Sequence, residues 1–185
     1  MSKTVYSIYD TSPKTEQIVA LLAQNNTPKL HLSGLVGSSI SFVIRSIFKK
    51  SELPFLLILN DKEEAAYYLN DLEQMIGDQD VLFYPASFRR PYQIEETDNA
   101  NVLLRAEVLN RINSRKKPAI IVSYPEALFE KVVTRKELDK NTLKVAVGDQ
   151  ISIDFINEVL FEYEFKRVDF ITEPGEFSVR GGIVD

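Results

Sequence analysis

The residues Gly34–Ser41, with the sequence Gly-Leu-Val-Gly-Ser-Ser-Ile-Ser, have part of the spacing of a phosphate-binding loop. Such a P-loop reads G-x-x-x-x-G-K-[ST], and its Lys reaches the β- and γ-phosphates of a nucleotide. Gly34 and Ser41 match the first and last positions, whereas Ser39 replaces the second Gly and Ile40 replaces the Lys. Because Ile has neither a charge nor a hydrogen-bond donor, we predict that this degenerate P-loop does not hydrolyse ATP.

Two interpretations of this loop lead to the same expectation. In the first, Gly34 and Gly37 only make a tight turn between a strand and a helix; in the second, the loop is a decayed nucleotide site. A helix N-terminus attracts an anion weakly through its free backbone amides. However, the loop contains no Lys or Arg to meet the charges of ATP. The sequence therefore predicts no catalytic residue, no metal site and no cofactor for this chain.

A second candidate site is the closing stretch Glu173–Asp185, which reads EPGEFSVRGGIVD. Pro174-Gly175 is typical of a turn, because Pro presets one φ angle and Gly accepts a positive one. The alternation from Phe177 to Arg180 is typical of a half-buried strand, and Gly181-Gly182 indicates a second turn. From spacing alone, the stretch is a hairpin.

Arg180 is the residue of this stretch that is best suited to recognition. Its guanidinium is a planar fork of donors that fits carboxylates, and Arg and aromatic residues dominate the energetics of interfaces. Gly181 lets a partner backbone approach closely, and Phe177 offers an apolar anchor, although strict alternation places Phe177 and Arg180 on opposite faces. The alternative is an exposed salt bridge from Arg180 to Glu173 or Glu176, which contributes little energy.

The closing stretch resembles the EPGEFxVRGGIxD signature of the Mfd family, the bacterial transcription-repair coupling factors. Val145–Asp149 and Tyr163–Phe170 also resemble the family's lead-in "VGD…GYxRVD", with Glu164 and Phe165 in place of the usual Gly-Tyr. The related UvrB family needs an intact P-loop, which Ile40 argues against. The resemblance implies an N-terminal fragment of a longer protein.

The resemblance also implies a function, namely a non-catalytic recruitment and autoinhibition module. The second domain would bind UvrA through Arg180, Phe177, Glu176 and Gly181, and the remaining domains of the same protein would mask this surface until activation. The full-length protein would be an ATP-dependent DNA translocase that displaces stalled RNA polymerase. Its ATP and Mg would lie in motor domains beyond Asp185.

Two alternatives stay open. Arg89, Arg90 and Tyr92 belong to a basic and aromatic stretch of the kind that binds single-stranded nucleic acid. The other alternative is a UvrB-type nucleotide-binding protein, which requires a cation elsewhere to compensate for Ile40.

Composition narrows these choices. The chain has 185 residues, a net charge of −5, one His and no Cys, so disulfides and thiolate metal sites are excluded. From Asn141 onward there are four basic and nine acidic residues, which argues against direct DNA binding by this segment, because phosphates attract clustered Lys and Arg. No apolar run approaches the ~20 residues of a membrane span and no secretion signal is evident, so we expect a cytoplasmic protein.

The pattern along the chain predicts an α/β fold for residues 1–140, because apolar strands alternate with amphipathic helices around a parallel sheet. Strands are expected at 29–33, 55–59, 81–84 and 118–123, and helices at 12–25, 38–50, 61–76, 101–112 and 125–132. We expect the strand at 55–59 to be buried on both faces. We also expect one stripe of the helix at 101–112 to be apolar; it comprises Val102, Leu103, Ala106, Leu109 and Ile112.

Residues 141–185 predict a smaller, truncated α+β domain. A strand is expected at 142–147, a turn at Gly148-Asp149, a helix at 152–163 and a strand at 167–171, before the closing hairpin. The complete expectation is a UvrB-like parallel-sheet domain with a degenerate P-loop, followed by the N-terminal part of a UvrA-binding domain.

Overall fold

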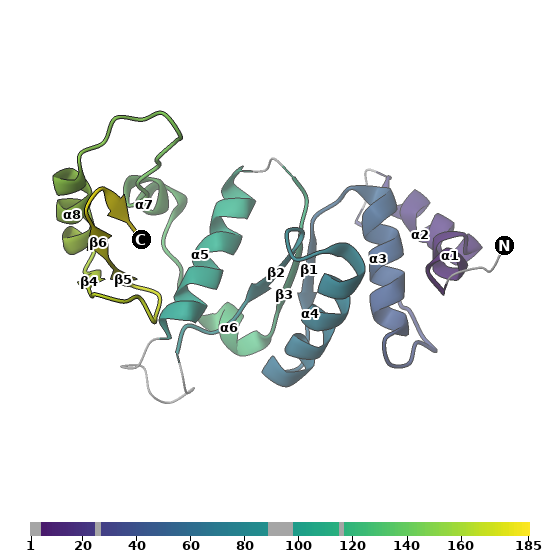
Figure 1. The fold of residues 1–185 in the computed structure, drawn as a ribbon. Helices are drawn as coiled ribbons and strands as arrows, with labels where there is room; N and C mark the ends of the chain where they lie inside the picture. Colours follow the sequence, from purple (N-terminus) through teal and green to yellow (C-terminus); the bar gives the residue numbers. More distant parts are fainter. Residues whose placement is uncertain (1–4, 25–26, 89–97, 115–116) are drawn as a thin grey trace. The chain divides into compact units, whose positions relative to one another are not determined.

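The structure is a computed structural model, which describes residues 5–24, 27–88, 98–114 and 117–185 (Figure 1). The chain divides into two compact units. The first comprises Met1–Ala86 and Leu104–Phe129, and the second comprises Ser87–Leu103 and Glu130–Asp185. In the described part of the chain, no helix is both long and apolar enough to cross a lipid bilayer.

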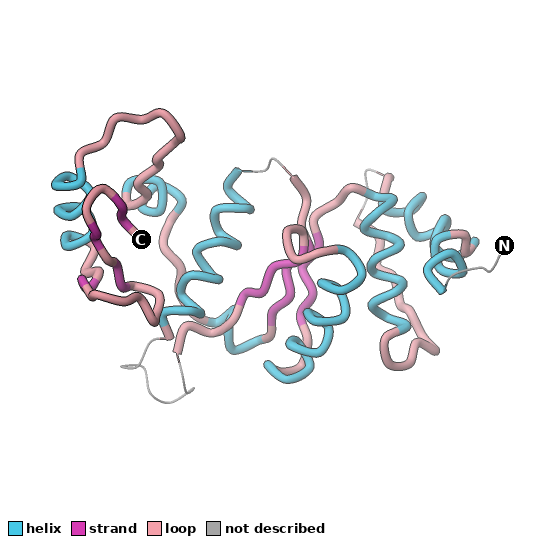
Figure 2. Tube along the Cα trace, in the orientation of Figure 1, coloured by secondary structure: helices cyan, strands magenta, loops and turns pink. Residues whose placement is uncertain are grey.

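The first unit is built on a three-stranded parallel sheet, whose strands are magenta in the middle of Figure 2. The strands are β1 (Phe55–Ile58), β2 (Val81–Tyr84) and β3 (Ile120–Ser123), in the order β1-β3-β2. Since β3 is hydrogen-bonded on both sides, it is the most buried, with Ile120 and Val122 fully enclosed. The prediction of an α/β fold with a parallel sheet is confirmed at this level.

Helices supply the rest of the first unit. They are α1 (Val5–Asp10), α2 (Pro13–Leu22), α3 (Ser39–Ser51), α4 (Lys62–Ile76), α5 (Asn99–Ser114, within this unit from Leu104) and α6 (Pro125–Phe129). Four of them add side chains to the core around β2 and β3, namely Phe48, Leu72, Val108 and Ala127. The sequence predicted five of these helices but not α1.

Helix α4 shows how local sequence sets an element's ends. The side chain of Asp61 accepts a hydrogen bond from the backbone N–H of Glu64 at 2.8 Å, which satisfies one of the free donors of the first turn. At the other end Gly77 takes a φ of 114°, a conformation that favours glycine. The predicted helix at 61–76 is thereby confirmed.

A partly buried ion pair holds α1 against α3. Asp10 accepts hydrogen bonds from Arg45 Nη1 at 2.9 Å and from Ser46 Oγ at 2.7 Å, and Tyr9 stacks on Phe42 with ring centroids 5.1 Å apart. Burial raises the pKa of the Asp10 carboxyl, but the bonds from Ser46 and Arg45 outweigh it, so the pKa is lowered overall.

Two strand predictions in the first unit are wrong. The strand at 55–59 is not buried on both faces: Phe55 and Leu57 pack against the core, whereas Leu56 and Ile58 alternate with them and are 53% and 57% exposed. Residues 29–33 form no strand; they are irregular, and Leu30 and Leu32 are exposed. An alternating pattern makes a strand only where a neighbouring strand supplies hydrogen bonds.

The predicted apolar stripe of α5 is also not its buried face. Arg105 and Val108 are buried, whereas Val102, Leu103 and Ile112 are exposed. Arg105 Nη1 donates to the backbone carbonyls of Pro85 at 2.7 Å and Ala127 at 3.0 Å. A prediction from hydrophobic periodicity assigns Arg to the exposed face of a helix. It therefore fails for α5, where a buried Arg donates to carbonyl acceptors.

The second unit contains short elements. They are α7 (Arg135–Lys140), α8 (Ile153–Glu162), β4 (Lys166–Arg167), β5 (Glu176–Phe177), β6 (Val179–Arg180) and β7 (Ile183–Val184). The predicted helix at 152–163 and the turn near Gly148 are confirmed. The strand expected at 142–147 is absent from these described residues, and the one expected at 167–171 is reduced to β4.

Candidate partner-binding site

The β6–β7 hairpin places Arg180 and Ile183 side by side. The two strands are antiparallel, with Arg180 opposite Ile183 and Val179 opposite Val184. Directly opposed residues of such a pair lie on the same face with their Cβ atoms about 5 Å apart. Gly181 makes the connecting turn with a φ of 61°. The Arg180 side chain is 62% exposed and Ile183 is 63% exposed, so this face of the hairpin is open to a partner.

Arg180 is ion-paired with Asp185, whose Oδ2 lies 2.8 Å from Arg180 Nη2. The sequence had offered Glu173 or Glu176 as its partner, and both are corrected by this contact. The backbone explains the choice: the N–H of Asp185 donates to the carbonyl of Ser178 at 3.0 Å, and the N–H of Ser178 donates to the carbonyl of Asp185 at 3.2 Å. These bonds bring Asp185 alongside the strand that carries Arg180.

Phe177 does not lie on the open face. It is 1% exposed, and its ring meets the edge of Phe161 with centroids 5.3 Å apart. Direct contact of Phe177 with UvrA stays a prediction, and the enclosure of the side chain within the second unit argues against it. Its position fixes the strand that leads into the hairpin.

Glu176 braces the turn before the hairpin. Its Oε2 accepts hydrogen bonds from the backbone N–H groups of Thr172 at 2.8 Å and Glu173 at 3.0 Å, and from the Thr172 hydroxyl at 3.1 Å. The backbone bonds from Thr172 and Glu173 hold the pKa of the Glu176 carboxyl below its ordinary value. Because this oxygen is already engaged, Glu176 shapes the site, and its direct contact with UvrA stays a prediction.

Two supporting residues were missed by sequence reasoning. Asn99 Nδ2 donates to the carbonyl of Pro174 at 3.1 Å, and Ser178 Oγ donates to the carbonyl of Asp169 at 3.2 Å. Ser178 is 2% exposed, so this short side chain is part of the interior. No local pattern points to Asn99, which is far from Pro174 in the sequence and meets it only in the fold.

The loop at Gly34–Ser41, which the sequence predicts to be a degenerate P-loop, is closed by its own side chains. Ser39 Oγ accepts from the N–H of Val36 and donates to the carbonyl of Val36, both at 2.7 Å. Gly34 and Gly37 have φ angles of 79° and 54°, which allow the tight turn. The strand expected before this loop is not formed, so the loop has no strand to precede it in the described residues.

The residues that would meet phosphate and Mg are occupied or apolar. Ser41 is fully buried, and its Oγ donates to Asp71 Oδ2 at 3.2 Å. Ile40 is half-buried in the first turn of α3. A carboxylate beside the N-terminus of α3 opposes the binding of an anion there.

Known proteins share sequence with this chain. Residues 143–185, which include the whole hairpin, match the protein family described as the UvrB interaction domain. The chain is 29% identical over 155 residues to the transcription-repair-coupling factor of Bacillus subtilis (strain 168), and 28% identical over 145 residues to that of Rickettsia bellii (strain RML369-C). The chain is similar to the transcription-repair-coupling factors. The resemblance predicted from the sequence is confirmed.

The similarity covers most of this chain and a small part of its relatives. It includes 83% of the chain and 13% of the length of the Bacillus subtilis transcription-repair-coupling factor. The UvrABC system protein B of Ureaplasma parvum serovar 3 is 25% identical over 168 residues, which are 83% of this chain and 25% of that protein. The chain thus spans about an eighth of the transcription-repair-coupling factors that it matches.

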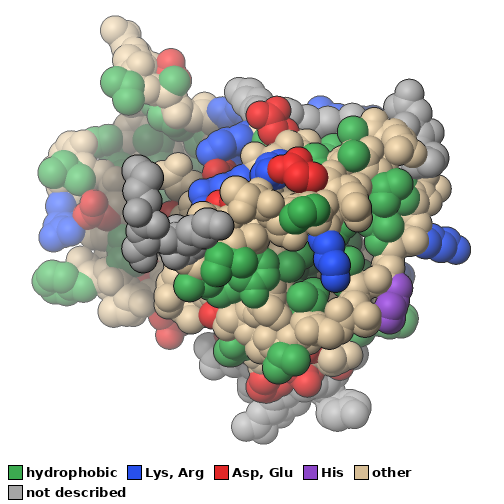
Figure 3. All heavy atoms as spheres, turned by 90° about the vertical axis from the view of Figure 1, so that its right-hand side faces the viewer, with side chains coloured by type: hydrophobic (Ala, Val, Ile, Leu, Met, Phe, Trp, Pro, Cys, Tyr) green, Lys and Arg blue, Asp and Glu red, His purple; other side chains and the backbone are tan. Residues whose placement is uncertain are grey.

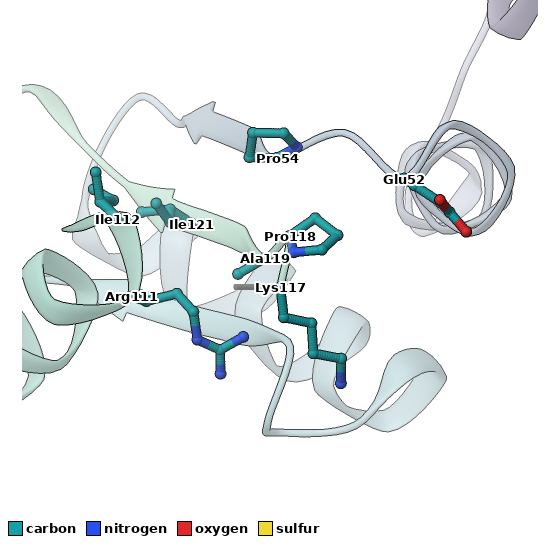
Figure 4. A pocket seen from close by; sticks show the side chains of 8 residues that line it. All are labelled: Glu52, Pro54, Arg111, Ile112, Lys117, Pro118, Ala119 and Ile121. Carbon is teal, nitrogen blue, oxygen red and sulfur yellow. The ribbon is translucent and has the colours of Figure 1, made fainter. Parts of the chain in front are cut away.

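A cavity in the first unit lies apart from these residues (Figure 4). It encloses about 520 Å³ and is lined by Glu52, Pro54, Arg111, Ile112, Lys117, Pro118, Ala119 and Ile121. Its two cations are already engaged, because Lys117 Nζ lies 2.8 Å from Asp80 Oδ2 and Arg111 Nη2 donates to the carbonyl of Gln79 at 2.6 Å. The similarity to transcription-repair-coupling factors assigns no role to this cavity.

The sequence also offered a basic and aromatic stretch and a lone His as candidates. Arg89, Arg90 and Tyr92 lie outside the residues that the structure describes. His31, the purple side chain in Figure 3, is exposed on a face where hydrophobic, basic and acidic side chains intermingle. It lies in the irregular segment before the degenerate P-loop.

Proposed function

We propose that this chain is a recruitment module that binds UvrA through the open face of the β6–β7 hairpin. The observation that carries the proposal is the match of residues 143–185 to the UvrB interaction domain, combined with the exposed guanidinium of Arg180 on that face. An Arg fork beside an apolar side chain is the kind of surface that dominates protein interfaces.

The names of the relatives support a wider role. We propose that the chain belongs to a transcription-repair coupling factor and acts in nucleotide excision repair in the cytoplasm. The full-length protein would be an ATP-dependent DNA translocase that displaces stalled RNA polymerase, with ATP and Mg in its motor domains. Since the chain spans 13% of such relatives, these activities belong to the longer protein.

The module itself is proposed to be non-catalytic. Ile40 stands where a P-loop has its Lys, and the hydroxyl of Ser41 is bonded to Asp71. Both features work against the binding of a nucleotide's phosphates, because one removes a cation and the other adds an anion.

Autoinhibition is the last part of the proposal. The second unit exposes several large apolar side chains, notably Phe155, Phe161, Phe170 and Ile183. Exposed side chains of this size supply apolar area that an interface can bury. The remaining domains of the longer protein would cover this surface, and with it Arg180, until UvrA is needed.

Calorimetric titration of the chain with purified UvrA tests the proposal. Saturable binding is expected, and Arg180→Ala should weaken it by about 30-fold, since truncation of a central Arg costs about 2 kcal/mol. Arg180→Lys keeps the charge but loses the planar fork, so its affinity for UvrA should lie between those of the unsubstituted chain and Arg180→Ala. If the chain and its Arg180→Ala variant bind UvrA equally well, or neither binds, the proposal is wrong.

A further inference from the structure

We propose that Ile183 is the apolar anchor of the UvrA-binding face and acts as one unit with Arg180. This inference rests on the proposed function, because it names the second residue of the same surface. The proposal assigns to Ile183 the contact that the sequence pattern had suggested for Phe177.

The register of the hairpin places Ile183 next to Arg180. The two residues are directly opposed in the antiparallel pair, so their side chains leave the same face as immediate neighbours. Ile183 is 63% exposed, so its side chain is accessible to a partner. Burial of such a side chain at an interface removes apolar surface from water and favours binding.

The hairpin holds both side chains on a prepared backbone. The pair of hydrogen bonds between Ser178 and Asp185 closes the open end of the hairpin, and Gly181 closes the other end. Asp185 also accepts a hydrogen bond from the exposed Arg180 guanidinium. Because little conformational freedom remains in the hairpin backbone, ordering this surface on binding costs little entropy.

The aromatic residues of the second unit are less suited than Ile183 to be the apolar anchor. Phe177 is enclosed. Phe170 is 78% exposed, but it follows Asp169 in the loop and is not paired with Arg180 in the hairpin. Ile183 is the exposed large apolar residue that the described strands place opposite the guanidinium.

This arrangement specifies the chemistry of the partner surface. A guanidinium beside an aliphatic side chain fits a carboxylate that lies next to an apolar hollow. The carboxylate on UvrA would share or replace Asp185 as the acceptor of Arg180, while the hollow receives Ile183. The complementary surface is therefore acidic at one point and apolar beside it.

Calorimetry with purified UvrA can separate this inference from the proposed function. Ile183→Ser should weaken binding by about tenfold, through the loss of buried apolar surface, and Ile183→Leu should retain most of the affinity. Val147→Ser is the matched control, because Val147 is a fully exposed aliphatic residue of the same unit in a turn away from the hairpin. A double substitution of Arg180 and Ile183 should weaken binding by less than the product of the two single effects.

Each outcome decides one of the two claims. If Arg180→Ala weakens binding and Ile183→Ser does not, the role of Ile183 is refuted and the proposed function stands. Equal losses for Ile183→Ser and Val147→Ser also refute it, because the effect would not be specific to the hairpin. The absence of binding by the unsubstituted chain refutes both. Circular dichroism of each variant checks that the fold is retained.

Discussion

The carboxylate of Glu176 is the residue-scale feature on which the shape of the hairpin depends. One oxygen receives two backbone N–H groups and a hydroxyl, all from Thr172 and Glu173, so the turn at Pro174-Gly175 is tied to the start of β5. Its lowered pKa means that the folded chain favours the ionised form. The unfolded chain must then bind protons more readily than the folded chain near the ordinary pKa of 4.5.

Stability should therefore depend on pH through Glu176. The contribution is complete above the unfolded pKa of about 4.5 and is lost as the pH falls through the lower folded value. Glu176→Gln should lower the melting temperature at pH 7, and the difference from the unsubstituted chain should shrink below pH 4.5. Glu173→Gln is the control, since its carboxylate makes none of these bonds. A difference that is independent of pH would contradict this account.

At the scale of elements, helix α8 ends in a Schellman motif that has Glu164 at the left-handed position, where Gly is usual. The N–H of Phe165 donates to the carbonyl of Leu160 at 2.9 Å, and the N–H of Glu164 donates to that of Phe161 at 3.0 Å. Glu164 has a φ of 61°, in the left-handed region where this motif usually has Gly. The resemblance noted in the sequence places a Gly at this position, which the geometry explains.

Glu164→Gly should stabilise the second unit by about 0.5–1 kcal/mol. The substitution removes a strain of roughly 1–2 kcal/mol from the left-handed backbone of the folded chain. Part of this gain is lost, because Gly gives the unfolded chain more conformational entropy. Glu162→Gly, at the last residue of α8, should have the opposite sign, because that position is helical. Urea unfolding followed by circular dichroism measures both, and a loss of stability in Glu164→Gly would show that the strain is absent.

The elements also show what the sequence can predict. Helix α4 has its cap, its apolar stripe and its closing Gly within one segment, so it is predictable from that segment. The failed strand at 29–33 and the buried face of α5 depend on partners elsewhere: a neighbouring strand in the first case, and the carbonyls of Pro85 and Ala127 in the second. The same limit applies to the site, where Arg180 was recognised from its motif but Ile183 needed the register of the hairpin.

At the scale of the whole molecule, the chain should not act as an ATPase. Calorimetric titration with Mg-ATP up to about 1 mM is expected to show no saturable heat, and phosphate release should match a buffer control. Ile40→Lys should not restore binding, because Ser41 remains bonded to Asp71. Micromolar affinity that Gly34→Val abolishes would contradict the prediction and revive the UvrB-type alternative.

The edge position of β1 has a consequence for the aggregation of the protein. Its outer side offers backbone donors and acceptors without a neighbouring strand in the described residues, and Leu56 and Ile58 add apolar surface beside them. Such an edge is a template on which strands of other chains can grow. In concentrated solution, the four residues of β1 therefore favour pairing with a strand of another chain.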